Sequence, residues 1–429
     1  MNHVHIMVAG LALLTAPLAA RAAAPAAEEC TVLVGGRVFD GARWLDGAPT
    51  VVLEGGRVRA VGGAAPPGCR VVEVAGKMVT PGLVDAATQI GLVEVPAEGA
   101  TVDLDLRAEF QDGEHLVRAS VRPDFAYNPR SAVIPVTRLG GVTSALVVPR
   151  GGVVAGSSFL VDLAGERQSD AIERTLVAMH ASVAGGDGSR ASALEVLRVA
   201  LAEATRYDRE KAAFEANRTR ALLLPWVELA ALAPVARGEE PLAVHVDRAS
   251  DIEGILRFAE GTKLRLLIFG GAEAWLVKDL LKARGVGVVT YPFADGPDGF
   301  DRVFARPDNA RILDEAGVSV AIASFDAHAS RKLRQLAGNA VRAGLAGESG
   351  LAAITSRPAA LLGLRDRGVL RAGAVANVVV WSGDPLEVTT LAERVFVHGR
   401  EMPRESRQTR LRDAYRRLPA RDGAGAAAP

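Results

Sequence analysis

Two short stretches of the chain carry side chains that could bind a metal ion or transfer a proton. His245 follows the apolar run 241–244, and Asp326 and His328 follow the run 318–325. Two imidazoles and one carboxylate form a common ligand set for a divalent ion, and the same groups serve as general acids and bases. We therefore take His245, Asp326 and His328 as a candidate metal site, with His245 and Asp326 as candidate catalytic residues. The alternative for His245 is a buried histidine bonded to a neighbour.

Two further residues bear on His245. Asp247 lies two residues beyond it and shares its face if the strand continues that far. A carboxylate beside an imidazole fixes the tautomer of the imidazole. The alternative role for Asp247 is the N-cap of the helix expected to follow. His180 also follows an apolar run, and we expect it to be a core or surface histidine.

The body of the chain must position these side chains. From about residue 81 to residue 364, apolar strand-like runs alternate with amphipathic helical stretches. This order predicts an α/β fold with a parallel sheet, and a count near eight favours a closed (β/α)8 TIM-like barrel. An open doubly wound sheet is the alternative, although no Gly-x-Gly-x-x-Gly follows a strand to support nucleotide binding. The expected strands are 142–148, 176–182, 222–227, 242–246, 264–269, 286–291 and 318–324.

Both ends of this body are flanked by short β-type runs broken by glycine pairs, at 30–80 and at 365–402. Period-two alternation in RVRAV and RVVEV is typical of a small antiparallel sheet. The two segments are therefore expected to form one small β-sandwich domain, with the barrel at 81–364 between them. The charged, alanine-rich tail at 403–429 is expected to be a surface helix followed by disorder.

Five motifs occur in order along the chain: GKMVTPGLVDA, RLGGVTSALVVPRGG, PLAVHVDRASDI, AGVSVAIASFDAHASRKL and AITSRPAALLGLRDRGVLRAGAVANVVVWSGDPLE. Their order resembles the amidohydrolase superfamily, and most closely its exported imidazolonepropionase-like members, over about residues 31–402. In that resemblance the first four motifs are similar to strands one, two, five and eight of the barrel. The fifth is similar to the closing helix and the return to the β-domain.

The resemblance implies a metal site, because catalytic relatives end strand one in Asp-x-His-x-His, add histidines on strands five and six, and place an aspartate on strand eight. A bound metal lowers the pKa of its water from about 15.7 towards about 7. His245 occupies the strand-five position, and Asp85 keeps the first-strand aspartate. The other family positions hold Ala87 and Gln89 in strand one, Gly270 in strand six (Phe269 if the register slips by one), and Phe325 in strand eight, one residue before Asp326.

Two functions follow as hypotheses. The resemblance implies a hydrolase of non-peptide carbon–nitrogen bonds, such as those of cyclic amides, with an incomplete or rearranged metal site that holds either one divalent ion such as zinc or none. The alternative is a non-catalytic relative that keeps the barrel pocket to bind a small molecule or that acts as a partner protein. Neither the substrate nor the oligomeric state follows from the residues.

Composition and the first residues limit partners and location. The chain has 50 lysines and arginines and 50 aspartates and glutamates among 429 residues. It therefore has no excess of positive charge that would attract nucleic acid. Residues 1–22 resemble a signal peptide and are short for a membrane span, so we expect an exported, periplasmic protein with no stable span after cleavage. In such a compartment Cys30 and Cys69 either form a disulfide worth roughly 3 to 4 kcal/mol or stay unpaired.

Overall fold

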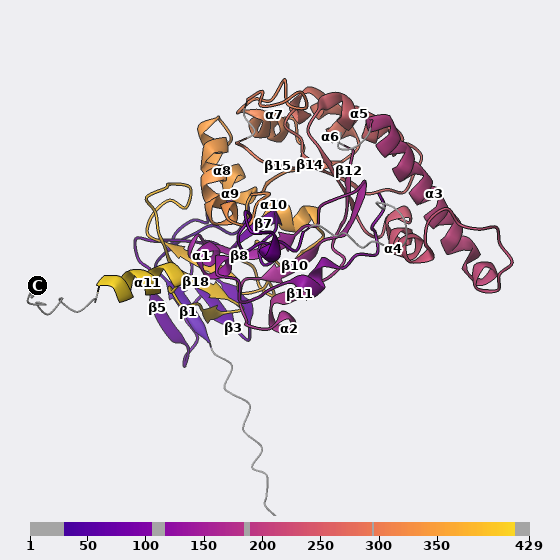
Figure 1. The fold of residues 1–429 in the computed structure, drawn as a ribbon. Coiled ribbons are helices and arrows are strands. Elements are labelled where there is room, and N and C mark those ends of the chain that lie inside the picture. The colour runs from indigo at the N-terminus through magenta and orange to yellow at the C-terminus, as the bar shows by residue number, and fades with distance from the viewer. Residues whose placement is uncertain (1–29, 105–115, 184–188, 294–295, 417–429) are drawn as a thin grey trace, which may run out of the picture.

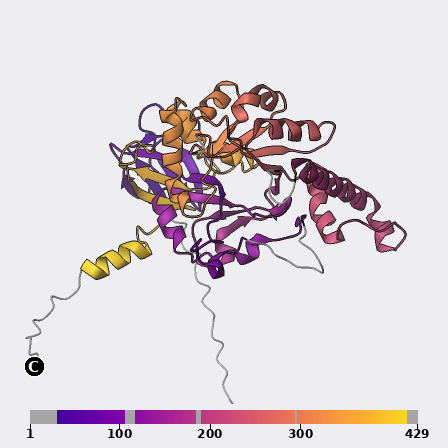
Figure 2. The same ribbon diagram turned by 45° about the horizontal axis from the view of Figure 1, so that its top comes forward.

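The computed structural model describes residues 30–104, 116–183, 189–293 and 296–416, which form a mixed α/β fold (Figure 1). The expected signal peptide and the end of the tail lie outside the described residues. Sheets built from both chain ends lie on one side of the molecule, and helix-covered central strands lie on the other (Figures 1 and 2). The mixed α/β class predicted from the sequence is therefore found.

Two sheets are built from the N-terminal and C-terminal segments, the first from N-terminal strands alone and the second from strands of both. One has the strand order β4-β3-β1-β5 and the other the order β19-β18-β17-β6-β2. Their apolar side chains, among them Leu53 of the first sheet and Phe396 of the second, share one buried cluster. The strands are β1 (Thr31–Val34), β2 (Arg37–Val38), β3 (Val51–Glu54), β4 (Arg57–Val61), β5 (Arg70–Glu73), β6 (Met78–Pro81), β17 (Val378–Trp381), β18 (Ala392–Val397) and β19 (Arg400–Glu401).

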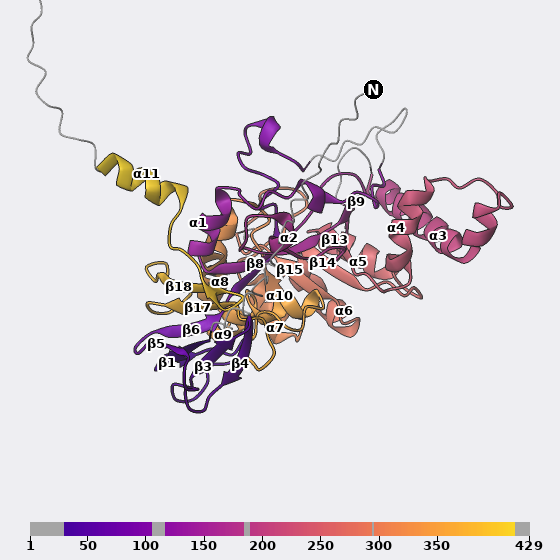
Figure 3. The ribbon, with the colours of Figure 1, turned by 90° about the horizontal axis from the view of Figure 1, so that it is seen from below.

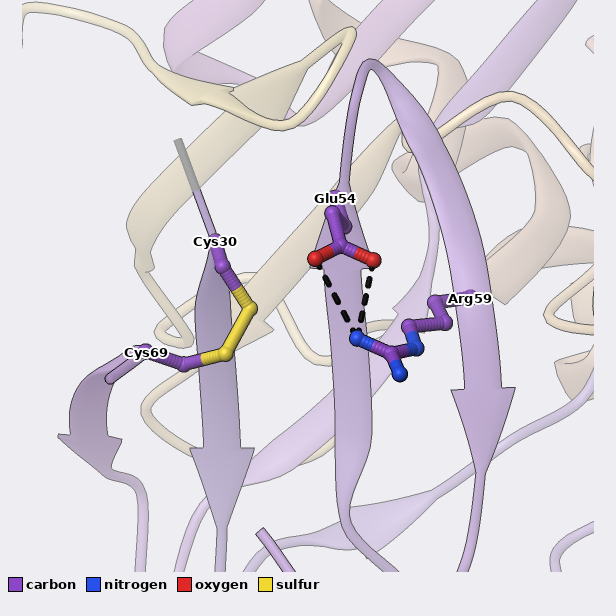
Figure 4. Close-up of a disulfide and its surroundings, with 4 residues drawn as sticks. All are labelled: Cys30, Glu54, Arg59 and Cys69. Atoms are coloured by element: carbon purple, nitrogen blue, oxygen red, sulfur yellow. Dashed lines mark hydrogen bonds and ion pairs between the residues drawn. A yellow bond between two sulfur atoms is a disulfide. The ribbon is translucent and has the colours of Figure 1, made fainter. Parts of the chain in front are cut away.

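A disulfide joins Cys30 to Cys69 beside the first sheet (Figure 4). The two cysteines directly precede Thr31 and Arg70, which are partners in the parallel pair of β1 and β5. The covalent bond therefore fixes the ends of two neighbouring strands at the point where their pairing begins. The alternative of unpaired thiols is not found.

The central strands form two ladders, ordered β16-β15-β14-β13-β12-β9 and β11-β10-β8-β7. The pair β7–β8 and the run from β12 to β16 are parallel, whereas β9 and β10 pair antiparallel to their neighbours β12 and β8. These strands are β7 (Leu83–Thr88), β8 (Val142–Val147), β9 (Val154–Ser157), β10 (Phe159–Asp162), β11 (Ile172–Arg174), β12 (Met179–Ser182), β13 (Leu242–Val246), β14 (Leu266–Gly270), β15 (Gly287–Thr290) and β16 (Val320–Ile322).

The two ladders meet at both edges. On one side the Ser158 N–H, between β9 and β10, donates to the Ala178 carbonyl at 2.8 Å, just before β12. On the other side the Phe325 N–H, just after β16, donates to the carbonyl of Ala87 in β7 at 2.7 Å. The parallel strands therefore end at a common edge of the molecule, although their ladders are not continuous.

Alternation along the parallel strands separates two apolar layers. Ala243 is the ladder partner of Leu267, and Val289 is the partner of Phe269, two residues beyond Leu267. All of these residues belong to one buried cluster. The residues between them, such as Val244 and Ile268, belong to a second cluster with the surrounding helices. Side chains of successive strand residues point to opposite faces, so the first cluster lies inside the curved strands.

Helices follow the strands and cover their outer face (Figures 1 and 2). The long helix α3 packs against α4, and the two project from the body together (Figures 1 and 3). The α-helices are α1 (Val133–Leu139), α2 (Gln168–Ala171), α3 (Arg190–Glu215), α4 (Trp226–Ala236), α5 (Ala249–Phe258), α6 (Lys278–Ala283), α7 (Asn309–Glu315), α8 (Leu333–Arg342), α9 (Gly347–Ala352), α10 (Ser356–Leu361) and α11 (Arg407–Arg416). Four 3-10 turns complete them: η1 (Gly99–Thr101), η2 (Pro123–Ala126), η3 (Ala274–Val277) and η4 (Ala329–Lys332).

One expected strand is wrong. Residues 222–227 lead into helix α4, whose N-cap is Pro225. Proline has no N–H to donate to a neighbouring strand and suits the start of a helix. The apolar run there therefore leads into a helix and does not form a strand. The other expected central strands are found as β8 and β12 to β16, each within a few residues of its predicted bounds.

The tail contains the expected surface helix, α11, which has no buried residue. Among the helices of the described ranges, none combines the length and the apolar character needed to cross a bilayer.

Candidate functional site

A cavity of about 230 Å³ opens where the parallel strands end. Its strand-end residues come from β12, β13 and β14, and its loop residues follow β8, β15 and β16. The carboxyl ends of parallel strands are the usual place for a ligand site in α/β folds. Six of the lining residues are Arg150, Ser182, His245, Gly270, Tyr291 and Phe325.

His245 forms a hydrogen-bonded pair with His180 at the inner wall of this cavity. A 2.9 Å hydrogen bond joins Nδ1 of His180 to Nε2 of His245. In the ladder His180 lies opposite Ala243, two residues before His245, so both imidazoles point to the inner face. Sequence reasoning placed His180 in the core or on the surface and missed this pairing. The strand register was the signal that could have revealed it.

Both imidazoles are neutral at pH 7. Burial lowers the pKa of His180 well below its ordinary value, with a further contribution from His245. Burial lowers the pKa of His245 to about 4, assisted by the positive charge of Arg150. In the described part of the chain, Nε2 of His180 is buried without a hydrogen-bond partner. The pair is therefore a neutral N–H···N unit with one free nitrogen.

The first-strand family positions lie inside the fold. Ala87 is fully buried in the inner apolar cluster, and its carbonyl holds Phe325 as described above. Gln89 is 3% exposed, and its Nε2 has no partner among the described residues. At the two positions that the resemblance assigns to histidines, the structure thus has a buried methyl group and a buried carboxamide.

Asp85 holds the end of strand β7 against the segment after β16. One carboxylate oxygen accepts the N–H of Ser324 at 3.0 Å, and the other accepts the hydroxyls of Ser324 and Ser330 at 2.5 and 2.7 Å. Burial raises the pKa of Asp85 to about 6 against the opposing effect of these hydrogen bonds. The residue thus anchors strand β7 to the segment after β16.

Gly270, the strand-six position, is held in a backbone conformation that disfavours a side chain. Its φ is +103°, and a Cβ placed there would lie 2.6 Å from Oδ1 of Asp247. That carboxylate is fixed, because Oδ1 accepts the N–H of Ala272 at 3.1 Å and Oδ2 accepts Nε–H of Arg302 at 2.9 Å. Asp247 therefore organises the loop after β14, whereas helix α5 begins at Ala249 after Arg248 as its N-cap.

Aromatic rings fill the space around His245. The Phe325 ring, at the strand-eight position, lies with its centroid 6.4 Å from His245, 6.2 Å from Phe269 and 6.5 Å from Tyr291. Phe269 also contacts both imidazoles edge-on or tilted, at 5.2 Å from His180 and 5.4 Å from His245. Apolar rings therefore pack around His245 on the sides that these contacts describe.

The structure separates His328 from the cavity that contains His245. Its Nε2 bonds the Glu94 carbonyl at 2.9 Å, at a different surface hollow. Asp326 is exposed, and its Oδ1 accepts the N–H of Ala329 at 2.7 Å. Burial, and then the charge of Asp326, raise the pKa of Tyr291. Asp326 directly follows Phe325, which lines the cavity. His245, Asp326 and His328 are not brought together as one ligand set.

A different cluster of ionisable groups lies where the terminal sheets meet the central strands. Within the described ranges, the group of three histidine and carboxylate side chains with ligand atoms mutually within 4.8 Å is Asp162, Glu173 and His398. Nε2 of His398 pairs with Asp162 at 2.8 Å and with Glu173 at 3.2 Å. The Arg367 guanidinium also pairs with both carboxylates, at 3.0 and 2.5 Å. The carboxylates are therefore already neutralised by cationic side chains.

Residues 311–402 match the model of the Amidohydrolase family, and the sequence and structure comparisons find proteins described as amidohydrolases among those similar to this chain.

The chain is similar to amidohydrolase tasK of Hapsidospora irregularis, 23% identical over 365 residues, which are 77% of this chain and 37% of that protein. The chain thus spans little more than a third of the length of this relative.

Among solved structures, an amidohydrolase from Thermotoga maritima is similar with a TM-score of 0.79 and 24% identity, over 87% of this chain and 100% of that one. An adenosine deaminase from Xanthomonas campestris with bound zinc is similar with a TM-score of 0.51 and 17% identity, over 90% and 97% of the two chains. These likenesses concern the fold.

Proposed function

We propose that this chain is an amidohydrolase-family protein that binds a small organic molecule in the cavity at the strand ends and does not assemble the metal centre expected of the family. The observation that carries the proposal is the packing at the family's ligand positions. Ala87 is buried in an apolar cluster, the Phe325 ring lies edge-on to the His245 ring, and Gly270 has no room for a Cβ.

The donor set supports this proposal. A divalent zinc ion is held by thiolate, imidazole or carboxylate groups, commonly four in number with any bound water. At the cavity the donors available to it are the imidazoles of His180 and His245, which are bonded to each other. The nearby carboxylate of Asp247 is bonded to Arg302 and Ala272. The residues present therefore do not fit the family's metal, and we derive no hydrolytic step through one.

A second candidate is hydrolysis of carbon–nitrogen bonds other than peptide bonds, such as those in cyclic amides. One observation favours it: Nε2 of His180 is buried without a partner, next to a neutral His245. A neutral imidazole can accept a proton from water or hold an ion. In this reading the histidine pair is the remainder of a rearranged site, with Asp326 at its edge.

Elemental analysis of protein purified without chelator tests the two candidates against each other. For a binding protein we expect substoichiometric zinc, iron and manganese, and the same melting temperature with and without EDTA. His328→Ala, outside the cavity, is the matched control for His245→Ala. One tightly held metal ion per chain, lost in His245→Ala and kept in His328→Ala, would refute the binding proposal and favour the hydrolase.

We propose further that the parallel strands form the (β/α)8-type barrel, bounded at about residues 81 and 364, and that the terminal sheets form a β-sandwich. The two meeting points of the central ladders support the first proposal, and the shared apolar cluster supports the second.

An exported, periplasmic location is also proposed. The apolar segment in residues 1–22 and the Cys30–Cys69 disulfide support it, because disulfides persist in oxidising compartments.

A further inference from the structure

Two arginines line the strand-end cavity, and their surroundings differ. Arg302 is neutralised, because its Nε–H donates to Asp247 at 2.9 Å and its Nη1 donates to Asp298 at 3.0 Å. Arg150 donates Nη2–H to the carbonyl of Phe325 at 2.8 Å, and within the described ranges it forms no ion pair with a carboxylate. One cation at the cavity is therefore matched by carboxylates and the other is not.

The backbone contact of Arg150 gives this cation a defined place. Phe325 lines the same cavity, so the exposed Arg150 side chain is tied to the cavity wall by this bond. Arg150 is also the charged group that acts on His245, as described above. A guanidinium presents five N–H donors in a planar fork, and one donor is used by the Phe325 carbonyl. The remaining donors are available to an oxyanion.

The rest of the cavity is suited to a flat apolar group. Phe269, Tyr291 and Phe325 line it, with the Phe325 centroid 6.2 Å from Phe269 and 6.5 Å from Tyr291, and the neutral His245 contacts Phe269 and Phe325. A volume of about 230 Å³ corresponds to roughly eight water molecules at about 30 Å³ each. This volume fits a small ring with one short substituent.

We propose that the cavity binds a small monocarboxylate, with its carboxylate on Arg150 and its planar apolar part against Phe269, Tyr291 and Phe325. This inference rests on the proposed binding function and names the class of ligand. A carboxylate fits better than a phosphate, because a single unmatched cation balances one negative charge and the other ionised lining groups, Asp247 and Arg302, are paired with each other. Arginine and carboxylate form paired, parallel hydrogen bonds.

Calorimetric titration of the full chain with matched pairs of probes tests the inference. The probes are benzoate, 3-phenylpropionate and indole-3-acetate, each compared with its uncharged primary amide. We expect at least one carboxylate to bind about tenfold or more tightly than its amide, since charge-assisted hydrogen bonds are about twice as strong as neutral ones. Arg150→Gln should abolish this preference, and Arg342→Gln, at an exposed position on α8, should keep it.

Other results would contradict the ligand class, the location of the site or the proposed binding function. If amides and carboxylates bind equally, or the preference survives in Arg150→Gln, the ligand class is wrong while binding in the cavity stands. Binding that persists unchanged when Phe325→Ala enlarges the cavity overturns the site itself. If no probe binds and the protein carries one metal ion per chain, both the ligand class and the proposed binding function are overturned.

Discussion

At the scale of single residues, the positions that the resemblance assigns to metal ligands are occupied by groups that pack against their neighbours. Ala87 belongs to an apolar cluster against which Phe325 packs, and Gly270 has a backbone conformation that a residue with a side chain rarely adopts. The resemblance pointed to these positions from the sequence, but not to their surroundings. It did not predict the His180–His245 bond, because two imidazoles on neighbouring strands meet only when the strand register is known.

Gly270→Ala is expected to destabilise the fold by about 2 to 4 kcal/mol, because it combines a strained backbone with a clash against a fixed carboxylate. Gly285→Ala is the matched control, since Gly285 also has a positive φ, +61°, but no atom within 4 Å of the added Cβ. The control should lose only about 1 kcal/mol. Urea unfolding of both variants measures the difference. Equal losses of unfolding free energy would show that the Asp247 carboxylate moves away from the added Cβ without cost.

At the scale of elements, the central strands could be predicted because continuous apolar runs are typical of buried parallel strands. The run at 222–227 failed because Pro225 begins a helix there. The antiparallel strands β9 and β10 escaped prediction because glycine and serine interrupt their apolar pattern. The side-chain contacts within the site depend on how neighbouring strands align, and a single sequence contains no direct record of that alignment.

The disulfide offers a test at this scale. It joins residues 39 positions apart at the start of a strand pair, so the double variant Cys30→Ser, Cys69→Ser should lose about 3 to 4 kcal/mol of unfolding free energy. Reduction of the wild-type protein should lower its melting temperature, while the double variant should be insensitive to reductant. Equal stability of oxidised and reduced protein would show that β1 and β5 hold together without the bond.

At the scale of the whole molecule, a charged network links the terminal sheets to the central strands. His398, in the turn between β18 and β19, pairs with Asp162 at the end of β10 and Glu173 of β11. These pairings raise the pKa of His398 to about 9 against the opposing effect of burial. Burial alone would raise the pKa of Asp162, but the hydrogen bond from His398 and the charge of Arg367 lower it.

The network predicts a pH dependence of stability. Because the pKa of His398 is raised on folding, its contribution is complete below about pH 6.5, the ordinary value, and is lost as the pH rises through about 9. His398→Asn tolerates the positive φ of 50° and should cost about 1 to 2 kcal/mol at pH 7. Unfolding measured from pH 6 to pH 10 should show this difference shrinking, while His328→Asn follows the wild type. A constant difference would refute the charge assignment.

The joining of both chain ends in one sheet also determines the order in which this protein can mature. Strand β6 has Val79 opposite Val380 of β17, so a ribosome must release the chain through residue 381 before that hydrogen-bonded edge can be completed. Contacts between residues so remote in sequence form slowly. Until β17 arrives, β6 has an unpaired edge, which is the kind of edge that can pair with another chain.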